Sequence, residues 1–177
     1  PLENQSTMNL VSLNQKFDIN LYPIFIKTGI LSSYYRSEYL ENSFDNPSFF
    51  SRTASISTDI FAHLDWRINS HIDLSSVARA QYFSNGRFFN ILPRIQILFF
   101  LDQRISIHAG YSQNVQYTNR ISFSNAVTAD IWILANEDQP PTRSEQFTAA
   151  LTFNPTDWFF FQTEIYQKKF ENLRLHE

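Results

Sequence analysis

The chain has 177 residues, with 14 basic and 17 acidic side chains and no cysteine. This composition excludes disulfide frameworks and cysteine-ligated metal sites, and the slightly negative charge argues against a nucleic-acid surface. Three glycines are too few for a phosphate loop or a dinucleotide fingerprint. The longest apolar runs are as short as residues 97–101, so the roughly 20 apolar residues of a transmembrane helix are missing. The first ten residues lack a signal-peptide pattern, which predicts a mature chain or a fragment.

Apolar and polar residues alternate with a period of two, which predicts strands along most of the chain. The clearest example is 104–117, where Ile105, Ile107 and Tyr111 alternate with Ser106 and His108. In chain order, strands are expected at about 7–15, 22–36, 56–67, 72–82, 89–100, 104–117, 144–154 and 158–171.

Charged residues within one strand share a parity, so one face tolerates charge and the other excludes it. The groups are Asp59, Asp65 and Arg67; Asp73 and Arg79; and Glu164 and Lys168. This pattern is typical of a membrane barrel wall or of a one-sided soluble sheet. Several runs exceed the five or six residues that are usual in globular strands and approach the roughly 9–11 that cross a bilayer. The sequence therefore predicts an all-β, antiparallel transmembrane β-barrel.

Short and long connections alternate along the chain. Short turns are expected around 14–21, 68–71, 101–104 and 154–157, and longer links at 38–54, 83–88 and 118–143. Outer-membrane barrels have short periplasmic turns and longer extracellular loops, so 118–143 is predicted to be a long extracellular loop. Both chain ends then lie on the outer side, whereas complete barrels usually have both ends in the periplasm. Residues 1–177 are accordingly predicted to be a partial barrel of about eight strands, an internal arc of a larger one.

Aromatic residues lie near the expected strand ends, where amphipathic rings suit the two membrane interfaces. The alternative is that they fill an ordinary β-core. The residues predicted to lie at the interfaces are Tyr34, Tyr35, Trp66, Tyr82, Tyr117 and Trp158.

Residues 125–173 contain three ordered motifs: T-x-D-x-W, P-x-R-S-x-Q and Y-x-K-x-x-x-N-L. These begin at Thr128, Pro141 and Tyr166, and a Pro-Arg strand followed by a short turn precedes them at Pro93 and Arg94. This region resembles the later part, the C-terminal half, of the barrel of TonB-dependent outer-membrane receptors. The resemblance implies a parent barrel of about 22 strands with a plug domain in its lumen.

The resemblance also implies a function. Such receptors sit in the outer membrane of Gram-negative bacteria and import scarce ligands, such as siderophores, vitamins, oligosaccharides or peptides. The implied partners are outer-membrane lipid, the remaining strands and the plug, the TonB complex acting through that plug, and a surface lipoprotein. The plug and the TonB-contacting segment are expected outside this chain. No enzymatic activity and no cofactor are implied.

Polar residues on the charge-tolerant faces, together with two residues of the long loop, are the candidates for contact with ligand or plug. They are Arg79, Gln81, Arg94, Gln96, His108, Asn114, Gln116, Asp130, Trp132, Gln146, Glu164, Tyr166 and Lys168. Each of them has the plainer alternative of contacting only plug and water.

Metal and catalytic sites have little support in the sequence. His63 and Asp65 share a strand face but supply only two ligands, and a first-row metal usually needs three or four. Glu137, Asp138 and Glu164 form no pattern from which a catalytic carboxylate pair can be argued.

Two other architectures remain open. A secreted, carbohydrate-binding β-sandwich predicts that Ile105, Ile107 and Tyr111 are covered by a second sheet. A complete small barrel with an adhesin or structural role predicts that the strand near residue 10 pairs with the strand near residue 165.

Overall fold

The computed structural model describes residues 3–42, 49–121 and 131–173. Strands account for most of these residues, and none of them forms a helix long and apolar enough to cross a bilayer. The strands are β1 (Glu3–Leu21), β2 (Ile24–Asn42), β3 (Phe49–Asn69), β4 (Ile72–Phe83), β5 (Phe88–Phe100), β6 (Ile105–Gln116), β7 (Thr118–Ile121), β8 (Ile131–Leu134), β9 (Thr142–Thr156) and β10 (Phe159–Glu171).

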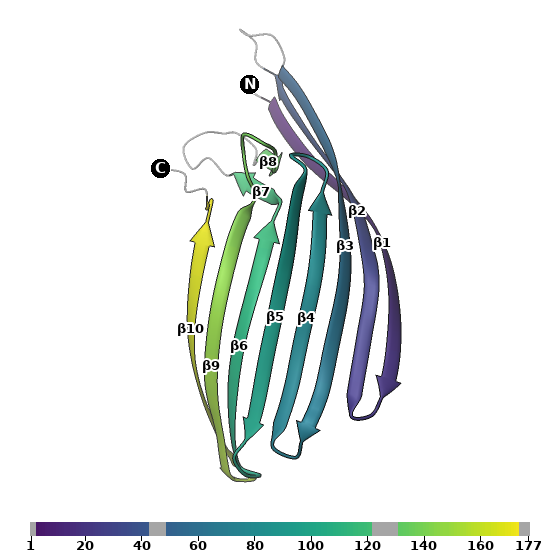
Figure 1. The fold of residues 1–177 in the computed structure, drawn as a ribbon. Helices are drawn as coiled ribbons and strands as arrows, with labels where there is room; N and C mark the ends of the chain where they lie inside the picture. The colour runs from purple at the N-terminus through teal and green to yellow at the C-terminus, as the bar shows by residue number, and fades with distance from the viewer. Residues whose placement is uncertain (1–2, 43–48, 122–130, 174–177) are drawn as a thin grey trace.

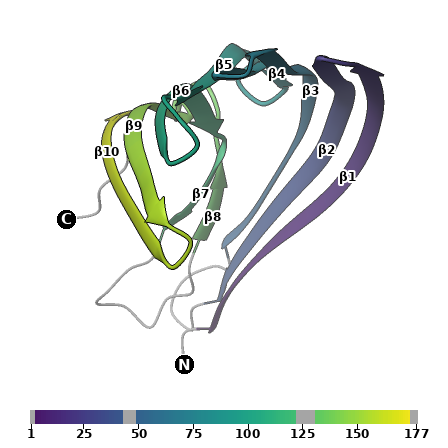
Figure 2. The same ribbon diagram turned by 90° about the horizontal axis from the view of Figure 1, so that it is seen from below.

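Eight strands form one antiparallel sheet in the order β1-β2-β3-β4-β5-β6-β9-β10, and β7 pairs with β8 in a small separate sheet. The large sheet curves into an open arc, with its tight turns at one end and its longer connections at the other (Figures 1 and 2). All eight expected strands are present. The predicted alternation of short and long connections holds only in part, because the β4–β5 link (84–87) is as short as the β5–β6 turn (101–104).

Two predicted boundaries and one predicted loop need correction. Residues 14–21 belong to β1, because the turn lies at Tyr22 and Pro23. The link predicted at 38–54 is mostly strand, since β2 runs to residue 42 and β3 starts at residue 49. Glu38 pairs with Arg52 across these extensions, and an ion pair 3.3 Å long joins the two side chains. The expected loop 118–143 contains β7 and β8, which are too short to show a period of two.

The two faces of the large sheet differ sharply in charge. Asn14 of β1, Asp59 of β3 and Asn114 of β6 line one hollow. Strands this far apart in the sheet can line the same hollow only on its concave side. On β1 to β5 the opposite, convex face carries no Asp, Glu, Lys or Arg between Ile56 and Trp66 of β3 or over the residues in register with them. On β9 and β10 the same face is uncharged up to Phe147 and Gln167, and Glu145 and Lys169 lie beyond them toward the long-loop end. The parity predicted from the sequence is therefore confirmed in three dimensions.

Burial is inverted relative to a water-soluble protein. On the convex face Ile60 is 56% exposed and Ile91 is 65% exposed, whereas on the concave face Ser57 and Asp59 are only 3% and 4% exposed. Ordinary globular proteins rarely bury aspartate or expose a continuous apolar surface of this extent. The convex face is therefore built for an apolar surrounding.

The height of the convex apolar band agrees with a bilayer. Ten residue steps separate Ile56 from Trp66 on β3, which corresponds to about 33 Å along the strand and about 25 Å along the membrane normal at a tilt of roughly 40°. Ion-paired Arg36 and Glu38 follow directly beyond Tyr34, the residue opposite Ile56. The band thus ends where charge begins.

The two alternative architectures do not fit this sheet. Ile107 is 41% exposed, and within the described ranges the only other sheet is the β7–β8 hairpin, which contacts β1, β2 and β3. The sandwich prediction is therefore wrong. Among the described residues β1 pairs only with β2 and β10 only with β9, so the closure predicted for a small complete barrel is wrong as well.

Gly29 of β2 offers a test of the packing on the concave face. A Cβ at this position would strike the carbonyl oxygen of Gln15 and lie 2.8 Å from Cζ of Phe61, whereas a Cβ on Gly110 of β6 would meet nothing closer than 3.6 Å. Gly29→Ala should lower the free energy of unfolding in detergent micelles by about 1–3 kcal/mol, the usual cost of overpacking. Gly110→Ala is the matched control, and equal urea midpoints for the two variants would contradict the packing described.

Candidate functional site

The β7–β8 hairpin packs against the inner surface of the arc near the long-loop end (Figure 2). Its anchor is a buried apolar cluster in which the Phe83 and Tyr117 rings stack with centroids 4.2 Å apart and Leu134 is only 2% exposed. Burial raises the pKa of the Tyr117 phenol, and its oxygen accepts a 2.6 Å hydrogen bond from Asn90 Nδ2.

Backbone contacts tie the hairpin to strands far from it in sequence. Ser37 Oγ donates to the carbonyl of Trp132 at 2.6 Å, and the Trp132 amide donates to Ser6 Oγ at 3.3 Å. Trp132, a predicted ligand contact, is thus held at the wall by its backbone, with its side chain half-buried. Asp130, the other loop candidate, lies outside the described residues. The hairpin therefore covers the inner wall formed by β1, β2 and β3.

Beneath the hairpin lies a hollow of about 410 Å³ that extends over β1 to β6. Its lining includes three cationic side chains, Lys16, Arg79 and Arg94, and a single carboxylate, Asp59. Leu31, Phe61, Val77 and Leu92 supply apolar surface to the same hollow. The lining thus combines a formal excess of two positive charges with apolar patches.

Asp59 and its cross-strand neighbour Gln81 each hold an oxygen that lacks a hydrogen-bond donor within the described part of the chain, Asp59 Oδ1 and Gln81 Oε1. Both residues are more than nine-tenths buried. Buried acceptors usually have a partner, either protein or ordered water. The concave face therefore has two buried oxygens that can accept hydrogen bonds from a bound partner or from water.

The strand register places eleven of the predicted contact residues on the concave face, in four groups. Arg79, Arg94 and Asn114 line the cationic hollow, and Asn114 also borders a neighbouring hollow of about 440 Å³. That second hollow also includes Gln81, Gln116 and Lys168. Gln96 and His108 lie toward the short turns, and Gln146, Glu164 and Tyr166 lie along β9 and β10.

Lys16 is the one cationic lining residue of this hollow that the sequence analysis missed, because residues 14–21 were assigned to a turn. Continuing the period of two from residue 7 to residue 21 would have placed Asn14 and Lys16 on the charge-tolerant face. Asp59 was recognised by parity, but no sequence pattern indicated that it would be buried.

The predicted interface aromatics divide between the two faces. Tyr34, Trp66 and Tyr82 lie on the exposed convex face, and Trp158 lies in the β9–β10 turn with 85% of its surface exposed. Tyr35 and Tyr117 were predicted at the interface, and this is wrong: both lie on the concave side against Phe83. Successive side chains of a strand point to opposite faces, so Tyr34 and Tyr35 cannot share one.

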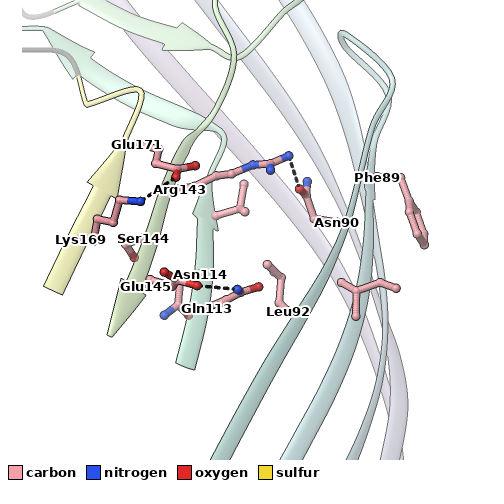
Figure 3. Close-up of a pocket in the computed structure, with 12 residues that line it drawn as sticks. Phe89, Asn90, Leu92, Gln113, Asn114, Arg143, Ser144, Glu145, Lys169 and Glu171 are labelled. Atoms are coloured by element: carbon pink, nitrogen blue, oxygen red, sulfur yellow. Dashed lines mark hydrogen bonds and ion pairs between the residues drawn. The ribbon is translucent and has the colours of Figure 1, made fainter. Parts of the chain in front are cut away.

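A seam interrupts the wall between β5 and β6 (Figure 3). Their ladder runs from Phe100↔Ser106 to Arg94↔Ser112 and stops there, although β4 pairs with β5 through Pro93 and beyond. Proline has no N–H to donate, which explains why the ladder ends beside it. Above the break, Asn90 of β5 is linked to β9, because Arg143 Nη2 donates to its Oδ1 at 2.8 Å.

His63 does not gather a metal site around it. Its Nε2 lies 2.9 Å from Asp65 Oδ1 and 3.1 Å from Ser75 Oγ. In the ranges that the structure describes, no group of three or more His, Cys, Asp or Glu side chains could hold a metal ion.

No protein-family model matches the chain, and no curated protein sequence matches it. Solved structures do. A mutant of the ferric enterobactin receptor PfeA from Pseudomonas aeruginosa matches with a TM-score of 0.72 and 10% identity, over 94% of this chain and 27% of that one. The chain has the fold of a section of a siderophore-receptor barrel.

Two further receptors match this barrel section. The siderophore receptor PirA from Pseudomonas aeruginosa matches with a TM-score of 0.67 and 10% identity, over 93% of this chain and 32% of its own. PirA from Acinetobacter baumannii matches with a TM-score of 0.67 and 12% identity, over 94% of this chain and 27% of that receptor. The barrel section thus spans about a third or less of the receptors it matches. The expected resemblance to TonB-dependent receptors is confirmed for the fold.

Leu134 allows a test of how the hairpin is anchored to this barrel section. Leu134→Ala should remove about 2–5 kcal/mol of packing from the cluster and speed amide exchange at Trp132 and Ala135 by at least about tenfold. Ile133→Ala is the control, because Ile133 precedes Leu134 on β8 and points to the other face. Exchange at Ile95 in the wall should not change, and equal exchange at Ala135 in the two variants would rule out the anchoring role.

Proposed function

We propose that this chain is part of the barrel wall of a TonB-dependent outer-membrane receptor that imports an anionic, oxygen-rich iron chelate of the siderophore class. The observation that carries the membrane location is the inverted burial of the sheet. Its convex face carries an uncharged band that is about one bilayer high on β3 and continues onto the other strands. The siderophore receptors with which the chain shares its fold support the transport role.

The cationic hollow supports the choice of ligand class. Lys16, Arg79 and Arg94 present N–H donors from three strands, and donors of this kind bind oxygen acceptors through charge-assisted hydrogen bonds. A neutral sugar or an apolar vitamin would leave this positive charge without a counterpart. An anionic chelate would meet both the charge and the nearby apolar surface.

The remaining partners follow from the same proposal. Outer-membrane lipid surrounds the convex face, the remaining barrel strands pair with the free edges of β1 and β10, and a plug contacts the concave face and links it to TonB. Residues 118–143 form an extracellular loop that borders the ligand entrance. The protein acts by binding and gated passage, and a surface lipoprotein is its proposed external partner.

Charge placed on the convex face tests the membrane assignment. Ile60 lies near the middle of the apolar band, so Ile60→Arg should lower the free energy of unfolding in lipid vesicles by about 2–4 kcal/mol. Val77→Arg on the concave face is the control and should change that energy much less. Equal stability of the two variants in a urea titration would contradict the proposal that hydrocarbon covers the convex face.

Ligand binding by the full-length protein tests the transport role. Arg79→Gln and Arg94→Gln should each raise the Kd for ferric enterobactin about tenfold or more, because a hydrogen bond to a charged group contributes about 1.5–3 kcal/mol. Arg104→Gln, in the exposed β5–β6 turn, should leave the Kd unchanged. Uniform affinity of all three variants, measured by fluorescence titration, would reject the cationic hollow as the binding site.

A further inference from the structure

The convex face carries a depression over β5, β6, β9 and β10. One row of paired residues runs Ile97–Ala109–Ala149–Ile165 across β5, β6, β9 and β10. Two small side chains between two large ones leave a hollow of about 470 Å³ with an almost wholly apolar lining. On a membrane-facing wall, such a depression has the shape and chemistry to accept a lipid acyl chain.

A second hollow of about 500 Å³ continues this depression toward the long-loop end and includes the seam (Figure 3). On each of the four strands, its lining residues lie two or more positions beyond those of the apolar hollow, as Gln113 lies beyond Tyr111 and Lys169 beyond Gln167. Two strand residues span about 7 Å, so the two hollows adjoin. Their common boundary is the ring pair Tyr111 and Phe147, with centroids 4.8 Å apart.

The upper hollow has hydrogen-bond donors to spare. Its carboxylates already accept bonds: Glu145 Oε1 from Tyr111 and Gln113 at 2.7 and 2.9 Å, and Glu171 Oε1 from Lys169 at 3.4 Å. Arg143 uses one nitrogen on Asn90, while a guanidinium carries five N–H donors and an ammonium three. Arg143 and Lys169 therefore favour an acceptor-rich group such as a phosphate.

We propose that these two hollows form a binding site for one outer-leaflet lipid with a phosphorylated head. Its acyl chain lies in the Ala109–Ala149 depression and passes the Tyr111–Phe147 pair, and its phosphate accepts bonds from Arg143 and Lys169. The Pro93 seam contributes by opening the wall at the depth of the head group. This inference rests on the membrane location in the proposed function, but it needs no transport activity.

The experiment uses the full-length protein purified from outer membranes, stripped of lipid and titrated in detergent with dioleoyl phosphatidic acid or dioleoylglycerol. Native mass spectrometry counts the bound lipid. The unaltered protein should bind one phosphatidic acid at least about fivefold more tightly than dioleoylglycerol, which has the same chains without the phosphate.

Matched variants separate the tail from the head. Ala109→Phe and Ala149→Phe fill the depression and should weaken phosphatidic acid binding at least about fivefold, whereas Ala62→Phe, on the convex face of β3 outside both hollows, should not. Lys169→Gln should reduce the preference for phosphate, and Lys168→Gln, on the concave face, should keep it. Heat-modifiable migration confirms that each variant is folded.

Equal binding of the two lipids, or equal binding by Ala109→Phe and Ala62→Phe, would overturn the proposal. A dimer that Ala109→Phe abolishes would also overturn it, because the depression would then belong to a second copy of the chain. Recovery of the protein from the soluble fraction would instead reject the proposed function itself. Recovery from the outer membrane without lipid preference would reject only the lipid site.

Discussion

The structure depends on one constraint: every strand of the large sheet must present an uncharged stretch to the convex side. A backbone that crosses hydrocarbon needs all its polar groups satisfied by neighbouring strands, which an antiparallel sheet provides except at its two edges. With the apolar side chains directed outward, polar side chains such as Asp59 and Ser57 turn inward and are buried there. Stability in such a wall comes from the strand ladders rather than from a central apolar core.

The concave face combines unpaired hydrogen-bond acceptors with apolar side chains. It carries buried acceptors without donors, at Asp59 and Gln81, beside the apolar side chains of Leu31 and Phe61. A lumen filled only with water would supply donors to these acceptors but would leave the apolar side chains exposed to water. A folded domain or a large ligand that offers both donors and apolar contacts meets both needs, which agrees with the proposal of a plug and an iron chelate.

Two irregularities give the regular wall its specific sites. The β7–β8 hairpin turns inward rather than outward because Leu134 and Tyr117 bury themselves against Phe83. Pro93 ends the β5–β6 ladder, and Asn90 and Arg143 close the resulting break with side chains instead of backbone. The first narrows the space inside the arc, and the second opens a hollow on the convex face. Both depend on residues that interrupt a repeating pattern.

Much of the wall could be predicted from the sequence because its physics is local. The period of two sets which face each residue takes, so the parity of Asp59, Asp65 and Arg67 predicted a one-sided sheet, and the run lengths predicted strands that cross a bilayer. The same rule, applied through residue 21, would have assigned Lys16 to the inner wall, and it would have separated Tyr34 from Tyr35.

Tertiary structure alone decided the rest. The hairpin is too short for periodicity to reveal, and its place depends on Ser6, Ser37 and Phe83, which are remote in sequence. The cationic hollow needs the curvature that brings β1 near β6, and the Ala109–Ala149 depression needs the strand register, because an alanine is a gap only beside larger neighbours. Alternation along one strand determines a residue's face, but contacts between strands determine its surroundings.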